Sequence, residues 1–132
     1  MTNSPRISPA ARWTGWVLSV LPALLLCFSA SMKFVNPPAV SDSFTHLGWP
    51  MRLAIVLGVL EVSVALIYLI PRTAVLGAIL CTGYLGGATA TTLRVGDSFM
   101  GPVILGMVIW LGLYLRDPRV RALIPLRRRP AA

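Results

Sequence analysis

The chain has few residues of the kinds that most enzymes use for chemistry. Its 132 residues include four Asp and Glu, one His and two Cys. Cys27 and Cys81 lack a C-x-x-C spacing, and a single histidine without clustered acids is too little for a metal site. We therefore expect neither a disulfide nor a bound metal. Phosphate-binding glycine loops, dinucleotide fingerprints and nucleophile elbows are also missing, so no residue is identified as catalytic.

Charge is scarce as well. Charged residues make up 12% of the chain and apolar residues 56%, with a mean hydropathy of +0.77. Soluble domains have about 25% charged and about 45–50% apolar residues. A soluble domain of this size could not bury so much apolar surface, whereas a bilayer can cover it. The composition therefore predicts a single all-α, polytopic membrane domain.

Four apolar runs predict the transmembrane helices of a four-helix bundle over residues 13–117. They cover residues 13–34, 51–70, 73–93 and 99–115. Crossing a hydrocarbon core of about 30 Å takes about 20 helical residues, so the last run is the shortest candidate. Residues 1–12 are expected to form a disordered cytoplasmic leader and residues 118–132 a basic cytoplasmic tail. The longest loop is expected to hold a short interfacial helix over 39–46.

The basic residues predict the orientation. If four helices alternate, nine of the twelve Lys and Arg residues fall on the side of both termini, and only Lys33, Arg52 and Arg94 fall on the other. By the positive-inside rule both termini are cytoplasmic, in a multi-pass protein of the bacterial inner membrane. The triplet at 127–129 has no interleaved aromatic residues, so we expect it to contact anionic lipid headgroups and not nucleic acid.

Glu61 is the one acidic residue inside an apolar run, and such residues usually face a protein interior. Counting helical depth places Gly83 and Tyr84 at its level. We expect the Tyr84 or Thr82 hydroxyl to hydrogen-bond the carboxyl, with Gly83 and Gly87 leaving space beside it. This interior polar site suits a proton relay or contact with a cofactor headgroup. A hydrogen bond that only fixes helix packing is the alternative.

A second polar set belongs to the opposite side of the membrane from the termini. Its members are Lys33, His46, Arg52, Arg94 and Asp97. Arg94 could pair with Asp97, and Lys33 with Asp42, as ordinary interfacial charges. Alternatively, the set forms an outer mouth above the bundle that receives an anionic or quinone-like ligand.

Small residues dominate the third apolar run. Gly83, Gly87 and Thr91 recur every four residues, a spacing that lets membrane helices approach closely. The run over 73–93 is therefore expected to be the central helix.

Several segments together match a known pattern. They are Leu-Gly-Val-Leu-Glu at 57–61, Tyr-Leu-Ile-Pro-Arg-Thr-Ala-Val-Leu-Gly-Ala-Ile-Leu at 68–80, Thr-Gly-Tyr-Leu-Gly-Gly-Ala-Thr-Ala-Thr at 82–91, Leu-Arg-Val-Gly at 93–96 and Trp-Leu-Gly-Leu-Tyr-Leu-Arg-Asp at 110–117. With them the chain resembles the DoxX-like family of small four-helix integral membrane proteins, over roughly residues 14–125. Relatives often carry a histidine at the position of Thr92, so the resemblance brings no catalytic residue here.

The resemblance implies a role but not a reaction. A named member of the wider DoxX grouping is a subunit of a thiosulfate:quinone oxidoreductase, and most relatives have no assigned activity. It thus implies an accessory subunit of a quinone-linked redox system, with a quinone as cofactor and a membrane redox enzyme or a second copy as partner. Two alternatives stay open: a proton-coupled small-molecule transporter that uses Glu61, and a purely structural membrane partner.

Overall fold

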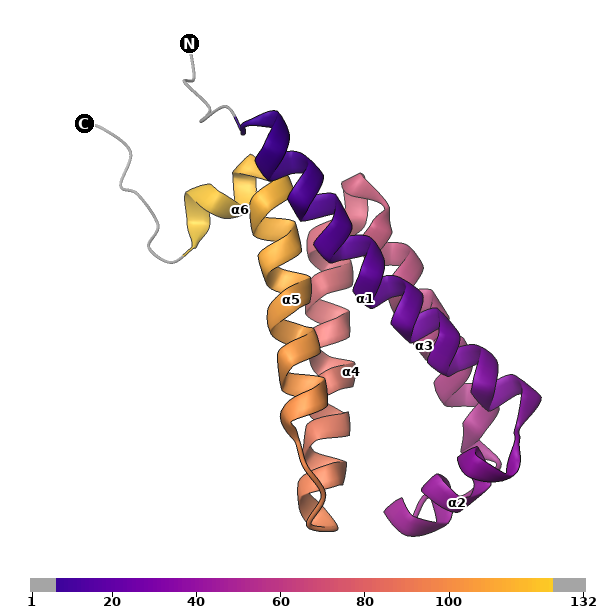
Figure 1. Ribbon diagram of the computed structural model, residues 1–132. Helices are drawn as coiled ribbons and strands as arrows, with labels where there is room; N and C mark the ends of the chain where they lie inside the picture. Colours follow the sequence, from indigo (N-terminus) through magenta and orange to yellow (C-terminus); the bar gives the residue numbers. More distant parts are fainter. Residues whose placement is uncertain (1–6, 125–132) are drawn as a thin grey trace.

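The computed structural model describes residues 7–124, and this part of the chain is all-helical, as predicted (Figure 1). Its elements are α1 (Pro9–Val35), α2 (Pro38–Leu47), α3 (Leu53–Leu69), the single 3-10 turn η1 (Pro71–Thr73), α4 (Ala74–Arg94), α5 (Met100–Arg116) and α6 (Pro118–Leu123). No strand occurs among the described residues.

The first helix begins four residues before the predicted start at residue 13. Ser8 caps it, because its hydroxyl oxygen accepts a hydrogen bond from the Ala11 amide at 3.2 Å, and Pro9 occupies the first helical position. Helix α1 therefore starts inside the segment 1–12 that was predicted to be disordered. Residues 1–6 of that segment lie outside the described residues.

The short helix predicted over residues 39–46 is confirmed as α2, which extends one residue further at each end than expected. Asn36 ends α1 in the left-handed conformation (φ 57°) just before two prolines, and Gly48 ends α2 in the same way (φ 77°). After α5, the Asp117 carboxylate accepts the Arg119 amide at 2.9 Å and starts α6. The tail residues 125–132, with the predicted lipid-binding arginines at 127–129, lie outside the described residues.

Four long helices contact one another in a ring. Helix α1 packs against α3 and α5, and α4 packs against the same two helices. The prediction that α4 is central is therefore wrong, since α1 has the same neighbours. Figure 1 shows the start of α1 and the end of α5 close to α6, while α2 lies at the opposite end. We call these the α6 end and the α2 end.

Glycines allow close helix contacts, between α1 and α5 at Gly15 and Gly112 and between α3 and α4 at Gly77, but not where the sequence predicted them. A Cβ at Gly77 would overlap the backbone of Tyr68, so α4 and α3 meet there at a distance that only glycine permits. A Cβ at Gly83 or Gly87 would meet nothing within 4 Å. The close-packing role expected for Gly83 and Gly87 is thus wrong, because these residues border open space.

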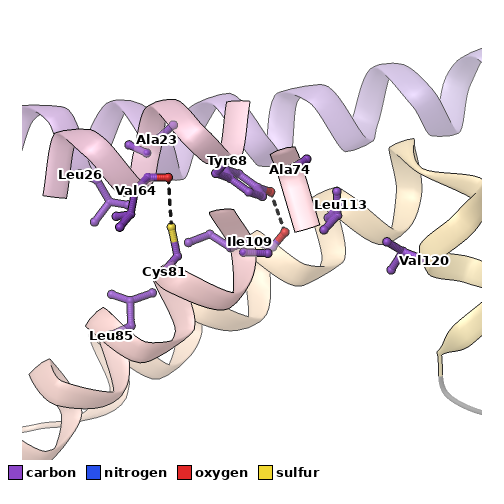
Figure 2. Close-up of a cluster of buried hydrophobic side chains, with 12 residues drawn as sticks. Ala23, Leu26, Val64, Tyr68, Ala74, Cys81, Leu85, Ile109, Leu113 and Val120 are labelled. Carbon is purple, nitrogen blue, oxygen red and sulfur yellow. Dashed lines mark hydrogen bonds between the residues drawn. The ribbon is translucent and has the colours of Figure 1, made fainter. Parts of the chain in front are cut away.

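The core lies between α1, α3, α4 and α5, nearer the α6 end. Figure 2 shows Tyr68 of α3 at its centre, facing Ile109 of α5. Tyr68 is fully buried, and its hydroxyl donates to the Ile109 carbonyl at 2.6 Å and lies 3.0 Å from Ser19 Oγ. Both cysteines are free, as expected, and the buried Cys81 thiol lies 3.8 Å from the Val64 carbonyl oxygen (Figure 2).

The outer surface is apolar. Large side chains on several helices are half or more exposed; examples are Leu24, Phe28, Ile55, Leu66 and Met107. By length and composition, two helical segments are suited to cross a bilayer, Pro9–Val35 and Pro71–Arg94. Helices α3 and α5 are apolar but have 17 residues each, about 26 Å of helix. The four predicted crossings are thus matched by two long and two shorter apolar helices.

Candidate functional site

Glu61 faces the interior of the helix assembly, as predicted. It lies at the middle of α3, and the residue is 3% exposed. Its carboxylate Oε2 accepts a hydrogen bond from the Lys33 ammonium of α1 at 2.8 Å, and the two groups form an ion pair. Lys33 donates a second hydrogen bond, to Ser29 Oγ at 2.7 Å, one helical turn earlier. The buried acid is therefore paired with a cation.

This pairing corrects two predictions. Thr82, one of the two partners expected for Glu61, does not contact it, and Lys33 pairs with Glu61 and not with Asp42. The Tyr84 hydroxyl, the other expected partner, does interact with the Glu61 carboxylate. Helical side chains lean toward the N-terminus of their own helix. Lys33 near the end of α1 therefore leans toward the middle of the assembly, and Glu61 on antiparallel α3 leans toward the α2 end. A residue count along each helix compares only the depths of the Cα atoms, so it does not predict that these two side chains meet.

A cavity of about 600 Å³ adjoins the ion pair at the α2 end. We call it the α2-end cavity. Figure 1 shows α1 with α3 diverging from α4 with α5 in this direction, and side chains of all five helices α1 to α5 line the cavity. Its walls are mostly apolar, and the polar residues that line it include Ser29, Lys33, Glu61, Tyr84, Thr91 and Thr92. Its volume is within the range of small-molecule sites, about 300–1,000 Å³.

Gly83 and Gly87 help to form this space. Both line the cavity, and neither has an atom within 4 Å of where a Cβ would lie. Gly83 and Gly87 thus border open space in the cavity that Glu61 also lines. Thr82 lies elsewhere: its hydroxyl donates to the Ala78 carbonyl at 2.7 Å and accepts the Trp110 indole N–H at 2.7 Å. The structure thus separates Thr82 from the other four predicted interior residues.

The cavity offers an unused hydrogen-bond donor. An ammonium has three N–H donors, and Lys33 uses two of them, toward Ser29 and Glu61. Tyr84 lines the cavity beside Glu61, and its hydroxyl interacts with the Glu61 carboxylate. A ligand would therefore find the third Lys33 N–H on a wall that also carries the Glu61 carboxylate and the Tyr84 hydroxyl.

The other members of the predicted outer mouth do not form one cluster. His46 Nε2 lies 2.9 Å from Asp97 Oδ2 in an exposed pair, and an Arg94 guanidinium N–H donates to the Leu47 carbonyl. The expected Arg94–Asp97 pair is thus replaced by two contacts that join α2 to the region where α4 ends and α5 begins. Arg52 is exposed and does not line the cavity. Of this set only Lys33 reaches the cavity.

Sequence reasoning missed several cavity residues. Ser29 lies one helical turn before Lys33, and this i, i+4 spacing is a signal that could have identified it. Trp49 and Phe44 of the α2 region also line the cavity, but nothing in the local sequence marks them as facing inward. No group of three or more His, Cys, Asp or Glu side chains suited to a metal ion occurs between residues 7 and 124.

Comparison with known proteins gives one match. A family model described as the DoxX-like family matches residues 17–114, which is well over half of the chain and includes all of α2, α3 and α4. No curated protein and no solved structure matches the chain.

Proposed function

The chain belongs to the DoxX-like family, and from this premise we propose that it is a membrane protein that binds a quinone-class ligand in the α2-end cavity as an accessory subunit of a redox system. The observation that carries the proposal is the buried Lys33–Glu61 ion pair on the wall of a largely apolar cavity of about 600 Å³. A quinone has an apolar ring, which suits the apolar walls of the cavity, and polar oxygens at the edge of the ring, which suit the ion pair.

The hydrogen-bonding groups support a quinone in particular. Quinone carbonyl oxygens accept hydrogen bonds, and the third Lys33 N–H is a donor on this wall, beside the Tyr84 hydroxyl. The reduced quinol carries hydroxyl groups, which would donate to the Glu61 carboxylate. The same cavity wall thus offers hydrogen-bonding partners to the oxidised quinone and to the reduced quinol. The chain binds the ligand, and a partner enzyme or a second copy of the chain in the same membrane completes the redox unit.

The membrane arrangement that accompanies this role has four crossings and both termini in the cytoplasm of a bacterium. Two features support it. The α6 end, which receives the start of α1 and the end of α5, carries a concentration of arginines; these are Arg12, Arg72, Arg116, Arg119 and Arg121. The α2 end has only Lys33, Arg52 and Arg94, and such asymmetry favours the basic end on the cytoplasmic side of the inner membrane.

Quinone binding can be tested by fluorescence, because Trp49 lines the cavity. Purified protein in a neutral detergent is titrated with a short-chain ubiquinone, and tryptophan quenching is recorded. We expect saturable quenching whose Trp49 component disappears in Trp49→Phe. Lys33→Met removes a donor from the cavity wall and should weaken binding by about tenfold.

Two neighbouring glycines give a matched control. Gly87 lines the cavity and Gly86 does not, yet a Cβ at either meets nothing within 4 Å. Gly87→Leu should therefore fill the cavity and abolish saturable quenching, while Gly86→Leu should bind like the unaltered protein. Equal binding by the two variants would show that the quinone does not occupy this cavity.

A proton-coupled small-molecule transporter is the second candidate, and the ion pair itself favours it. Protonation of Glu61 would remove its attraction for Lys33, so proton binding and ligand binding could compete at one place. Proteoliposomes with an imposed pH gradient would then show substrate-dependent proton flux that Glu61→Gln abolishes. A purely structural partner predicts neither quenching nor flux, and Glu61→Gln would then lower stability alone.

A further inference from the structure

A second cavity, of about 370 Å³, lies at the α6 end, far along the helices from the proposed quinone site. We call it the α6-end cavity. Its lining includes Trp16 of α1, Arg72 of η1, Arg116 at the end of α5, and Asp117 and Arg119 at the start of α6. Three arginines and one carboxylate therefore surround one hollow, which leaves it with a net positive charge.

Arg116 is the unusual member, because its guanidinium is buried without an acid partner. The residue is 8% exposed, and no carboxylate forms an ion pair with it within the described residues. Nη2 donates to the Tyr68 carbonyl at 2.9 Å, whereas the buried Nε has no acceptor. Leaving a buried cation unpaired is costly, and an arginine stays charged in proteins.

Aromatic rings hold this guanidinium in place. Its central carbon lies 4.3 Å from the centroid of the Trp16 ring and 4.9 Å from that of Tyr68, within the distance for cation–π attraction. Such contacts offset part of the cost of burial but supply no negative charge. The arrangement presents a fixed cation to the cavity and lacks the anion that would neutralise it.

The other charges around the cavity favour an anion as well. Arg72 and Arg119 are exposed at its edge, where their side chains are free to reach a bound group. The single opposing charge is Asp117, and its Oδ1 already accepts the Arg119 backbone amide at 2.9 Å. A planar guanidinium presents paired N–H donors that fit the oxygens of a phosphate group.

We propose that the α6-end cavity binds the phosphate group of an anion, with Arg116 at its base and Arg72 and Arg119 at its edge. Two sources share this chemistry: the headgroup of an anionic phospholipid and soluble phosphate. The exposed apolar side chains of Trp13 and Val17, which lie within one turn of Trp16 on α1, offer a surface for acyl chains and favour the lipid.

The test measures thermal unfolding of the purified protein in a neutral detergent with three separate additions. These are dihexanoyl phosphatidylglycerol, dihexanoyl phosphatidylcholine and inorganic phosphate. Stabilisation by phosphatidylglycerol in excess of phosphatidylcholine, without an effect of inorganic phosphate, supports a lipid headgroup site. Equal stabilisation by inorganic phosphate supports a site for the phosphate group alone. If none of the three additions raises the unfolding temperature, the proposal is wrong.

Variants at the edge locate the site without disturbing the core. Arg72→Gln and Arg119→Gln change exposed residues, and each should raise the apparent Kd for phosphatidylglycerol about fivefold. The control is Arg52→Gln, an exposed arginine at the α2 end that lines neither cavity and should bind like the unaltered protein. Arg116→Gln should abolish binding. Equal Kd values in the Arg72, Arg119 and Arg52 variants would overturn the assignment, whether or not Arg116→Gln folds.

Discussion

The Lys33 ammonium and the Glu61 carboxylate lie 2.8 Å apart although their residues belong to different levels of two antiparallel helices. Lys33 is the third residue from the end of α1, and Glu61 is at the middle of α3. Their side chains converge because each leans toward the N-terminus of its own helix. Lys33, which the sequence assigns to the membrane surface, is thus the partner of the buried Glu61.

The ion pair should behave as a unit in unfolding experiments. Its side chains are 14% and 4% exposed, so removing one partner leaves a nearly buried charge. Lys33→Met and Glu61→Leu should each lower the free energy of unfolding by about 3–5 kcal/mol, and the double variant should lose less than the two together. Circular dichroism during SDS titration of detergent-purified protein measures this cycle. Strict additivity of the two single effects would contradict the coupling.

Tyr68 should stabilise the fold through its hydroxyl. The hydroxyl joins α3 to α5 and α1 through the Ile109 carbonyl and Ser19, and the residue is fully buried. Tyr68→Phe should cost about 1–3 kcal/mol, because the polar groups it contacts lose a partner inside the protein. Tyr114→Phe is the control, since the Tyr114 hydroxyl makes no hydrogen bond among residues 7–124. The two variants are compared by thermal unfolding, and an equal loss in both would argue against the hydroxyl contact.

Two glycines on α4 should respond to alanine in opposite directions. A Cβ at Gly77 overlaps the Tyr68 backbone, which cannot move without shifting α3. Gly77→Ala should therefore destabilise the protein by about 1–3 kcal/mol. Gly83 has open space, so Gly83→Ala should be neutral or stabilising by up to about 1 kcal/mol from its better helix propensity. Unfolding midpoints in detergent measure both, and a larger loss at Gly83 would show that the helix contact is placed wrongly.

The exposed His46–Asp97 pair should contribute little to stability. Its side chains are 57% and 45% exposed, unlike those of the buried pair. Asp97→Asn should change the free energy of unfolding by less than about 1 kcal/mol, because water screens such pairs. Raising the salt concentration should not alter the result in the variant. A loss as large as that of Glu61→Leu would mean that this contact holds α2 against the other helices.

Much of the secondary structure could be predicted because it depends on local sequence. Apolar runs of nearly membrane length become the helices α1, α3, α4 and α5, and the prolines and Gly48 bracket the short helix α2. The family could be identified for the same reason, since its segments are contiguous in the chain. Helix α1 starts earlier in the chain than predicted, because Ser8 and Pro9 form a helix start although the residues around them are polar.

Contacts between helices were harder to predict. The sequence placed Glu61 in the interior correctly but missed its Lys33 partner, and it assigned close helix packing to Gly83 and Gly87, whereas Gly77 on the same helix makes such a contact. The buried Arg116 was counted only as an orientation signal, although it lies between Trp16 and Tyr68. The Lys33–Glu61 contact was missed because side chains lean along their helices, and the other two errors concern how far a helix is rotated about its axis, which the pattern of an almost uniformly apolar helix does not specify.

The amino-acid sequence by itself determined that this protein is helical, apolar on its outside and of the DoxX-like family, because these properties follow from composition, run length and contiguous motifs. Only the tertiary structure decided that Lys33 meets Glu61, that the α4 glycines border a cavity and that Arg116 is buried without an acid. Those outcomes depend on the rotation and spacing of helices distant in the chain, which are set by the packing of the whole assembly.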